Sequence, residues 1–563
     1  MTRLFRELKI TPNRREFFKT MGAGAAGLTL GAAATSRAAS AAPAADEDDK
    51  QVLFIGDDIA LADTQYGKVK GYELRGIYYF LGIPYGADTS GANRFMPPQK
   101  PKPWTDVLPA VWWGNTAPQK MDNRYANAYV SFADHWNYDE VSEDCLRLNV
   151  FTPAMDDGKK RPVLVWLHGG GFTNGNGIEQ DGYNGENISR YGDIVFCSVN
   201  HRLGPIGFSD FSAVGGERFA QSGNAGILDI IAALEWVHAN IANFGGDPDD
   251  VTIVGQSGGG AKVCTVVAMP AAKRLVHKGV ALSGNIAGAV PQEFSEKLGA
   301  YILKEAGLTG GQMDELQQLP WREYIDIANR ASAKIIKDTG GSGMMRGSFG
   351  PVADGIDVPK GTFYSDPSTP SASIPMIFSS TFNEFSPDRI DGSLSRITLD
   401  GVKEKLKARY GDKTAKVVDA YAAAFPECRP VEVWSLIVSN RQLVVAAADA
   451  KVKQRSPVFM AWFGWQPPLF DGRMRAFHCL DICFWFSNTD LMLTHTGGGA
   501  RPRKLSKIMA DTLLRFMRTG DPNGEGLPAW PKYTAEKGEL MILNDTCEVK
   551  GDPDREARLT LPA

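Results

Sequence analysis

The stretch Val251-Thr-Ile-Val-Gly-Gln-Ser-Gly-Gly-Gly260 joins a β-branched run to a segment of small and apolar residues. Residues 251–254 have the composition of a buried strand, and residues 261–268 have the composition of a helix. Ser257 stands between them in a glycine-rich turn. We therefore predict a strand, a tight turn and a helix, with a serine hydroxyl presented at the apex of the turn.

The glycines around Ser257 explain how such a turn can form. A serine on so sharp a turn takes strained backbone angles, and a side chain at Gly255 or Gly259 would collide with the adjoining strand or helix. The beginning of a helix beneath the hydroxyl also favours developing negative charge. Gly-x-Ser-x-Gly in this context is typical of the nucleophile elbow of α/β-hydrolases. The Gly-x-Ser-x-Gly pattern by itself is weak evidence for an elbow, because a chain with 60 glycines can contain it by chance. The predicted strand before it and the predicted helix after it decide the interpretation.

Length and composition favour a large enzyme and disfavour several other classes. The chain has 563 residues, 43% hydrophobic content and a formal net charge of −4. This charge gives no indication of nucleic-acid binding. Beyond the N-terminus we find no uninterrupted apolar run of the length that a membrane helix needs, so we expect no stable membrane span.

Strand-like runs alternate with helical periodicity, which predicts a central, mostly parallel sheet with helices on both faces. Residues 228–237 are apolar at helical spacing, and residues 300–333 and 402–425 are expected to form helical cap insertions. Residues 67–71 and 78–85 predict a small N-terminal antiparallel β region. The runs expected as strands of the main sheet are residues 148–152, 162–167, 193–199, 251–254, 279–283, 375–379 and 458–463.

The first residues have the pattern of an export signal. Asn13-Arg-Arg-Glu-Phe-Phe-Lys19 matches the twin-arginine motif, and a Gly/Ala-rich segment follows at residues 21–34. Ala-x-Ala-like cleavage candidates stand between residues 39 and 44. The glycine content and short length disfavour the alternatives, a basic amphipathic helix or a membrane anchor. We expect residues 1–44 to be a signal peptide for the twin-arginine export machinery, and residues 45–563 to be a single α/β-hydrolase domain, periplasmic or secreted.

The seven cysteines define neither a disulfide framework nor a metal site. Their number is odd and they are widely spaced. Cys479 and Cys483 would lie one turn apart if both were in a helix, but no Cys-x-x-Cys pair or histidine cluster accompanies them. We expect no metal and no cofactor.

A glycine run upstream of the elbow supplies candidates for an oxyanion hole. His168-Gly-Gly-Gly-Phe172 follows an apolar strand, and consecutive glycines leave backbone N–H groups open to a substrate carbonyl. We select the N–H groups of Gly170 and Gly171, together with that of Gly258 directly after the serine. The alternative is a flexible glycine turn without this role.

A serine nucleophile also needs a histidine base, and the chain has seven histidines. In α/β-hydrolases the order is serine, acid, histidine, so the candidates downstream of Ser257 are His277, His478 and His495. His277 lies close to the elbow at an expected helix end, and His495 lies in a glycine-rich, mobile-looking loop. His478 follows a strand–loop pattern, so we select it as the base; a structural histidine is the alternative.

The acid that orients the base must lie between the serine and the histidine. Glu384 follows the strand-like residues 375–378, and the C-terminal ends of parallel strands carry functional groups in α/β sheets. Asp354 and Asp388 are alternatives that satisfy the same order. The position after the strand favours Glu384.

With these residues assembled, the chain resembles the type B carboxylesterase family, which includes cholinesterases and bacterial carboxylesterases. The resemblance covers nearly the whole mature chain and implies that Glu384 and His478 complete a triad with Ser257. The segments similar to family landmarks, in family order, are Ser142-Glu-Asp-Cys-Leu-Arg-Leu-Asn149, Asn200-His-Arg-Leu-Gly204, Phe244-Gly-Gly-Asp-Pro248, Pro351-Val-Ala-Asp-Gly355, Asn383-Glu384, Ala476-Phe-His478 and Thr519-Gly-Asp-Pro-Asn523.

Four positions depart from the pattern of that family. The family elbow usually has Glu before the serine and Ala after it, where this chain has Gln256 and Gly258. We expect Gln256 to keep a hydrogen-bonding role without the charge. Cys145 resembles the cysteine that closes a disulfide loop, but no cysteine precedes it. Trp136 is similar to the cation-binding tryptophan of cholinesterases, but the missing loop and a shorter spacing disfavour choline recognition.

We expect a serine carboxylic-ester hydrolase that forms an acyl-enzyme on Ser257 and acts on small-molecule esters. Aromatic residues within 125–138, 462–465 and 484–486 favour an apolar or aromatic substrate group, although each of them could equally belong to the core. The same triad also serves amides, carbamates, thioesters and lactones. A further alternative is a non-catalytic binding scaffold, because the family includes adhesion proteins that lack the serine.

Overall fold

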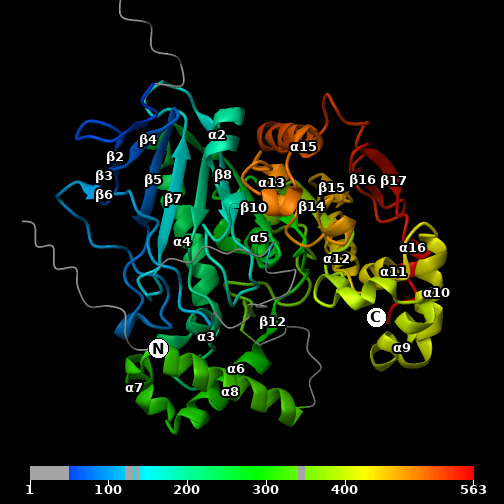
Figure 1. The fold of residues 1–563 in the computed structure, drawn as a ribbon. Coiled ribbons are helices and arrows are strands. Elements are labelled where there is room, and N and C mark those ends of the chain that lie inside the picture. The colour runs from blue at the N-terminus through cyan, green and yellow to red at the C-terminus, as the bar shows by residue number, and fades with distance from the viewer. Residues whose placement is uncertain (1–49, 121–131, 133–139, 340–348, 563) are drawn as a thin grey trace, which may run out of the picture. The chain divides into compact units, whose positions relative to one another are not determined.

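A twelve-stranded sheet forms the centre of the fold (Figure 1). The computed structural model describes residues 50–120, 132, 140–339 and 349–562, and Val52–Ala563 form one compact unit. The strand order is β1-β4-β5-β7-β9-β8-β10-β11-β14-β15-β16-β17. From β9 to β16 in this order, every strand is parallel to its neighbour. The strands outside this block are antiparallel to theirs.

Burial explains the sequences of the central strands. Every residue of β9, β14 and β15 is buried, as the near-continuous apolar runs predict for strands covered on both faces. The predicted mostly parallel centre of the sheet is therefore confirmed. The strand bounds, in sheet order, are β1 Leu53–Phe54, β4 Tyr72–Leu74, β5 Ile77–Pro84, β7 Arg147–Thr152, β9 Val195–Val199, β8 Arg161–Leu167, β10 Gly246–Gln256, β11 Lys278–Leu282, β14 Met376–Thr381, β15 Val458–Phe463, β16 Glu539–Leu543 and β17 Glu548–Gly551.

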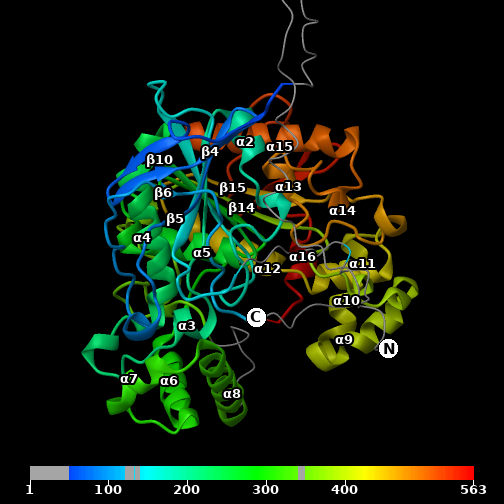
Figure 2. The same cartoon turned by 60° about the vertical axis from the view of Figure 1, so that its left-hand side comes forward.

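Helices cover both faces of the sheet (Figure 2). Along β8, Val163 and Val165 enter the core beneath α4 and α5, whereas Leu164 and Trp166 enter the core beneath α13 and α15. This alternation follows from the two-residue period of a strand. The helices of the first face are α4 Ala225–Asn240, α5 Gly258–Ala268 and α12 Arg441–Lys451, and those of the second are α2 Glu186–Gly192, α13 Ile482–Trp485 and α15 Ala500–Thr519.

One helical segment of the described residues has the length and composition of a membrane span, and it belongs to this core. Glu217–Phe244, which includes α4, has the length and apolar composition to cross a membrane, but 67% of its most apolar window is buried. Ile227, Ile230 and Leu234 of α4 pack in the same core as β8 and β10. Burial against the sheet therefore accounts for its composition.

The expected cap helices form two insertions, which glycines divide into shorter helices. Gly307 follows α6 with φ 72°, and Gly411 follows α9 with φ 54°; positive φ values of this kind end helices. In Figure 1 the first insertion is green and the second yellow. The helices are α6 Gln292–Ala306, α7 Met313–Gln318 and α8 Trp321–Thr339 in the first, and α9 Leu399–Tyr410, α10 Thr414–Ala424 and α11 Pro430–Ile437 in the second. The short helices elsewhere are α3 Gly204–Phe208, α14 Leu493–Thr496 and α16 Arg555–Arg558.

The expected N-terminal β region is divided between two sheets. β5 joins the large sheet through β4 and β7. β3 Gly67–Lys70 instead pairs with β2 Leu61–Thr64 and β6 Leu108–Pro109. The expected antiparallel N-terminal strands are therefore present, and their division between two sheets is an addition from the structure, because strand composition does not specify which strands pair. A two-stranded sheet of β12 Val290–Pro291 and β13 Val352–Ala353 completes the strands described.

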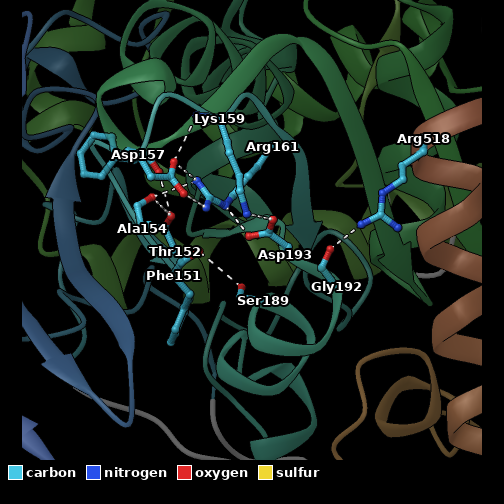
Figure 3. A network of polar contacts seen from close by, with 11 residues as sticks. Phe151, Thr152, Ala154, Asp157, Lys159, Arg161, Ser189, Gly192, Asp193 and Arg518 are labelled. Atoms are coloured by element: carbon cyan, nitrogen blue, oxygen red, sulfur yellow. Dashed lines mark hydrogen bonds and ion pairs between the residues drawn. The ribbon is translucent and has the colours of Figure 1, made fainter.

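An ion-pair network fixes the N-terminal end of β8 (Figure 3). The guanidinium of Arg161 donates to both oxygens of Asp157 and, at 2.7 Å, to Oδ1 of Asp193. Lys159 Nζ donates to the other oxygen of Asp193 at 2.8 Å. Asp193 has φ 46° and caps the C-terminal end of α2. The network therefore ties β8 to α2 at the end of the strand opposite His168.

Candidate active site

Ser257 occupies the turn between β10 and α5. Its backbone angles are φ 57° and ψ −125°, a strained conformation for a residue with a side chain, at a cost of about 1–3 kcal/mol. Its N–H donates to the carbonyl oxygen of Leu282, at the end of β11, at 2.7 Å. The predicted strand, tight turn and helix are confirmed, and the neighbouring strand helps to hold the strained residue.

Close backbone contacts explain the glycines of the elbow. A Cβ atom on Gly255 would lie 2.4 Å from the carbonyl oxygen of Gly259. A Cβ atom on Gly259 would lie 1.9 Å from the carbonyl oxygen of Leu167, the last residue of β8. Since real Cβ atoms essentially never approach within 3.0 Å, both positions require glycine for this turn.

The loop after β8, His168-Gly-Gly-Gly-Phe172, touches the elbow. Gly170 and Gly171 have φ values of 80° and 65°, which favour glycine. A Cβ atom on Gly258 would lie 2.4 Å from the backbone nitrogen of Gly171 and 2.0 Å from its oxygen. The structure thus brings the glycine loop against the residue that follows Ser257. The use of these three N–H groups as oxyanion donors stays a prediction.

Glu384 and His478 form a hydrogen-bonded pair. Glu384 follows β14 by three residues, and its Oε2 lies 2.5 Å from Nδ1 of His478. The second oxygen, Oε1, accepts from the N–H of Thr381 at 2.8 Å, and the His478 N–H donates to the Glu384 carbonyl at 3.1 Å. Glu384 is completely buried. Because Nδ1 faces the carboxylate, we assign its proton there, which leaves Nε2 as the basic nitrogen.

Charges around His478 raise the pKa of its imidazole. Burial by itself lowers this pKa, but Cys479 and then Glu384 raise it by more, and it ends well above its ordinary value of 6.5. Asp481, three residues on, is also buried, and burial followed by the charge of Glu384 raises the pKa of its carboxyl to about 7. The Glu384–His478 pair therefore lies in a buried, acidic surrounding.

Gln256 connects the histidine to the elbow. Its Nε2 lies 3.4 Å from each ring nitrogen of His478, and its Oε1 accepts from the Sγ of Cys479 at 3.2 Å. Gln256 immediately precedes Ser257, so these contacts place the imidazole beside the serine turn. The hydrogen-bonding role expected for Gln256 is confirmed in these contacts. Sequence reasoning missed the part of Cys479, whose only signal was its position next to His478.

The two alternative acids have other partners. Asp354 Oδ1 accepts from the N–H groups of three successive residues, 356 to 358, as in a tight turn. Asp388 Oδ1 accepts from Nη1 of the buried Arg475 at 2.7 Å. Neither contact involves a histidine, whereas Glu384 contacts His478 directly.

The two alternative histidines also lie elsewhere. His277 Nδ1 accepts from the N–H of Val251, at the part of β10 away from Ser257. His495 lies in the short helix α14, fully buried, with its ring edge-on to Phe477 at 5.1 Å between centroids. The expectation of a mobile-looking loop at His495 is wrong, because core packing rather than local composition decides the conformation there.

The aromatic candidates for substrate contact divide into core and surface residues. Trp462, Trp465 and residues 484–486 are buried in the two cores and do not line an open site. Phe385, which sequence reasoning did not select, is 47% exposed, and its ring lies 4.8 Å from that of His478. Trp136 lies outside the described residues, as does most of the aromatic segment 125–138. Among the described residues, Phe385 is therefore an exposed aromatic side chain that directly adjoins the Glu384–His478 pair.

The described residues contain no candidate metal cluster and no disulfide. Among the described residues, no group of three or more His, Cys, Asp or Glu side chains is arranged to hold a metal ion. The seven cysteines, all within the described ranges, form no disulfide. Cys145 is fully buried in the first core, so packing replaces the disulfide that its resemblance would imply.

A parallel sheet with a serine on a strained strand–helix turn, followed by a carboxylate–histidine pair, defines an α/β-hydrolase. Residues 59–559 match the sequence profile of the Carboxylesterase family, and the chain belongs to this family. It is accordingly a carboxylic-ester hydrolase.

Relatives with known names are similar along almost their whole length. The chain is 32% identical to the para-nitrobenzyl esterase of Bacillus subtilis (strain 168) over 89% of this chain and 98% of that protein. It is 30% identical to the phenmedipham hydrolase of Pseudarthrobacter oxydans, over 89% and 99%. Among solved structures, an esterase from Clostridium hathewayi that can hydrolyze aliphatic aromatic polyesters is 33% identical, with a TM-score of 0.77 over 90% and 98%. These similarities confirm the expected family and fold.

Proposed function

We propose that this chain hydrolyses carboxylic esters through an acyl-enzyme on Ser257, with His478 as general base and Glu384 as the group that orients it. The observation that carries the proposal is the Glu384–His478 hydrogen bond, held beside the strained serine turn by Gln256. A strained turn exposes the hydroxyl, and a carboxylate on Nδ1 leaves Nε2 to take its proton.

The reaction proceeds in two halves. Ser257 Oγ attacks the ester carbonyl while Nε2 of His478 takes its proton, and the N–H groups of Gly170, Gly171 and Gly258 bind the oxyanion. The imidazolium then protonates the leaving alcohol, which departs and leaves the acyl group on Ser257. Water, activated by His478, releases the acid. Each oxyanion donor contributes about 3–4 kcal/mol to lowering the barrier.

Esters with an apolar or aromatic group are the proposed substrate class. Phe385 presents an exposed ring next to His478, and a flat apolar surface at this position favours stacking of an aromatic group near the reacting carbonyl. The names of the relatives agree with this class, since a para-nitrobenzyl esterase and an esterase active on aliphatic aromatic polyesters are among them.

We also propose export of the chain by the twin-arginine route, with residues 1–44 removed and the mature enzyme periplasmic or secreted. The proposal rests on Arg14 and Arg15 in their motif and on the alanine-rich segment that follows. Amino-terminal sequencing of the exported protein is expected to begin near residue 45. Retention of the uncleaved chain in cells with an intact twin-arginine system would contradict the proposal.

The esterase assignment is tested by hydrolysis of p-nitrophenyl acetate and butyrate by the parent and by Ser257→Ala. We expect turnover in the parent and a loss of about 10⁶-fold in kcat for the variant, because the nucleophile is gone. A folded parent without turnover would contradict the proposal and favour the binding scaffold.

A further inference from the structure

A fully buried lysine lies beneath the glycine loop. Lys262 belongs to α5, the helix that begins directly after Ser257, and its side chain is 0% exposed. Its Nζ donates to the carbonyl oxygen of His168 at 2.8 Å. That carbonyl belongs to the peptide that leads into Gly169, at the start of the glycine loop. Lys262 thus connects the helix of the nucleophile to the loop proposed to bind the oxyanion.

A buried carboxylate provides a counter-charge for this lysine. Glu179 is 7% exposed and accepts from the hydroxyl of Tyr183 at 2.8 Å. A Cβ atom on Gly175 would lie 3.0 Å from Glu179 Oε2 and 2.6 Å from His168 Nδ1, so carboxylate and loop meet at this turn. Burial lowers the pKa of Lys262 to about 7 and raises the pKa of the Glu179 carboxyl to about 7, while the charge of each group opposes the shift of the other. Each group therefore favours the ionised form of the other.

The other basic groups of this region do not supply a free positive charge to the loop. The rings of His168 and His201 stack at 5.1 Å between centroids. Burial, followed by the charge of Lys262, holds the pKa of each imidazole well below its usual value, so both are neutral. Arg202 is paired with the buried Asp229 at 2.6 Å. Lys262 is the basic side chain that donates a hydrogen bond to the backbone at the start of the loop.

We propose that Lys262 is a positioning residue for ester hydrolysis, which fixes the first peptide of the oxyanion loop from the helix that carries Ser257. A lysine is almost never fully buried without a partner, because its desolvation is costly. A charge-assisted hydrogen bond from the ammonium to this carbonyl holds in place the peptide that precedes Gly170 and Gly171, and a water-excluded site strengthens the bond. The inference rests on the proposed function, since it concerns the same oxyanion loop.

The chain offers a matched control in a second buried lysine. Lys451 of α12 is also 0% exposed, and burial lowers the pKa of its ammonium to about 7. Its Nζ donates to Ser371 O, Gln454 Oε1 and Ser456 Oγ, which belong to neither the elbow nor the glycine loop. Replacing it removes a comparable buried charge and leaves the site untouched.

The experiment compares Lys262→Met and Lys451→Met in the full chain. Methionine preserves the length of the stem without the charge. We expect both variants to lose thermal stability, but only Lys262→Met to lose about 10–100-fold in kcat for p-nitrophenyl butyrate, with KM changed less than about threefold, because oxyanion stabilisation acts in the transition state. A phenylboronic acid, which forms a tetrahedral adduct with the serine, is expected to lose affinity for Lys262→Met by a similar factor.

Two results would overturn the inference. The first is a kcat of Lys262→Met that stays within about twofold of the kcat of Lys451→Met, in an experiment where the parent is active and Ser257→Ala is inactive. The other is a lower kcat with unchanged boronate affinity, which would place the effect outside the oxyanion loop. An inactive parent would instead be a failure of the esterase assignment. If Lys262→Met does not fold, Lys262→Gln against Lys451→Gln makes the same comparison, because glutamine retains a donor without the charge.

Discussion

Gly258 leaves room for the glycine loop, whose backbone lies where a Cβ atom would otherwise be. We predict that Gly258→Ala lowers kcat by about 10–1000-fold, because the methyl group would displace Gly171, whose N–H is a proposed oxyanion donor. Steady-state kinetics on p-nitrophenyl butyrate measures the change. Gly311→Ala is the control, since a Cβ atom at Gly311 meets nothing within 4 Å. A Gly258→Ala variant as active as this control would show that the loop does not need its present position.

Burial lowers the pKa of His478, but Cys479 and then Glu384 raise it by more, which gives activity a predictable pH dependence. The base must be neutral, so kcat/KM in the parent should rise with pH through a pKa above about 6.5 and then level off. Glu384→Gln removes a charge that favours the imidazolium. We therefore expect the rising limb to move to lower pH and the plateau to fall by about 10⁴-fold. Rates of Ser257→Ala are subtracted as background. A limb that stays in place or moves to higher pH would contradict this assignment.

The residues of the site differ in how well the sequence alone reveals them. Ser257 lies in a local Gly-x-Ser-x-Gly pattern, which predicts that side chains at Gly255 and Gly259 would collide with neighbouring backbone. The structure shows these close backbone contacts. Chain order, the position after a strand and the family resemblance indicate Glu384 and His478, and their hydrogen bond joins residues 94 positions apart. The contact of Lys262 with His168 also joins residues 94 positions apart, but no motif marks it. A buried charge in an ordinary helix can be recognised only when its partners are known.

At the scale of the elements, the Arg161 network stabilises β8 at the end away from the site. We predict that Arg161→Met lowers Tm by a few degrees, because it leaves Asp157 and Asp193 without their shared, 3% exposed guanidinium. At 25 °C kcat should stay within about twofold, since β8 reaches the glycine loop only at its other end. Arg503→Met breaks a pair exposed on both sides, and as the control it should change Tm little. A large fall of kcat in folded Arg161→Met would contradict this separation.

The central elements were predictable because their causes are local. The strands of the parallel block are apolar along their whole length, and the helices between them have a 3.6-residue period. The division of β3 and β5 between two sheets was not predictable, because pairing depends on the rest of the fold. The conformation at His495 was not predictable for the same reason. The glycine-rich sequence around it indicates a loop, but packing in the core places His495 in the short helix α14.

At the scale of the whole molecule, the strained serine, the Glu384–His478 pair and the glycine loop come from separate parts of the chain. The sheet brings them together, since β8, β10 and β14 all end at the same edge. Two residues of the segment around Ser257 make further contacts with these parts. Gln256 contacts His478, and Lys262 contacts the carbonyl at the start of the glycine loop. We therefore propose that the whole fold prepares Ser257 to act as the nucleophile.

Covalent labelling of the full chain with a fluorophosphonate probe tests this claim most directly. The probe requires a nucleophilic serine with its base, so we expect one label per chain, mapped by peptide mass spectrometry to Ser257. The label should be absent from Ser257→Ala and strongly slowed in His478→Ala. Labelling at another residue, or equal labelling of the parent and Ser257→Ala, would contradict the account.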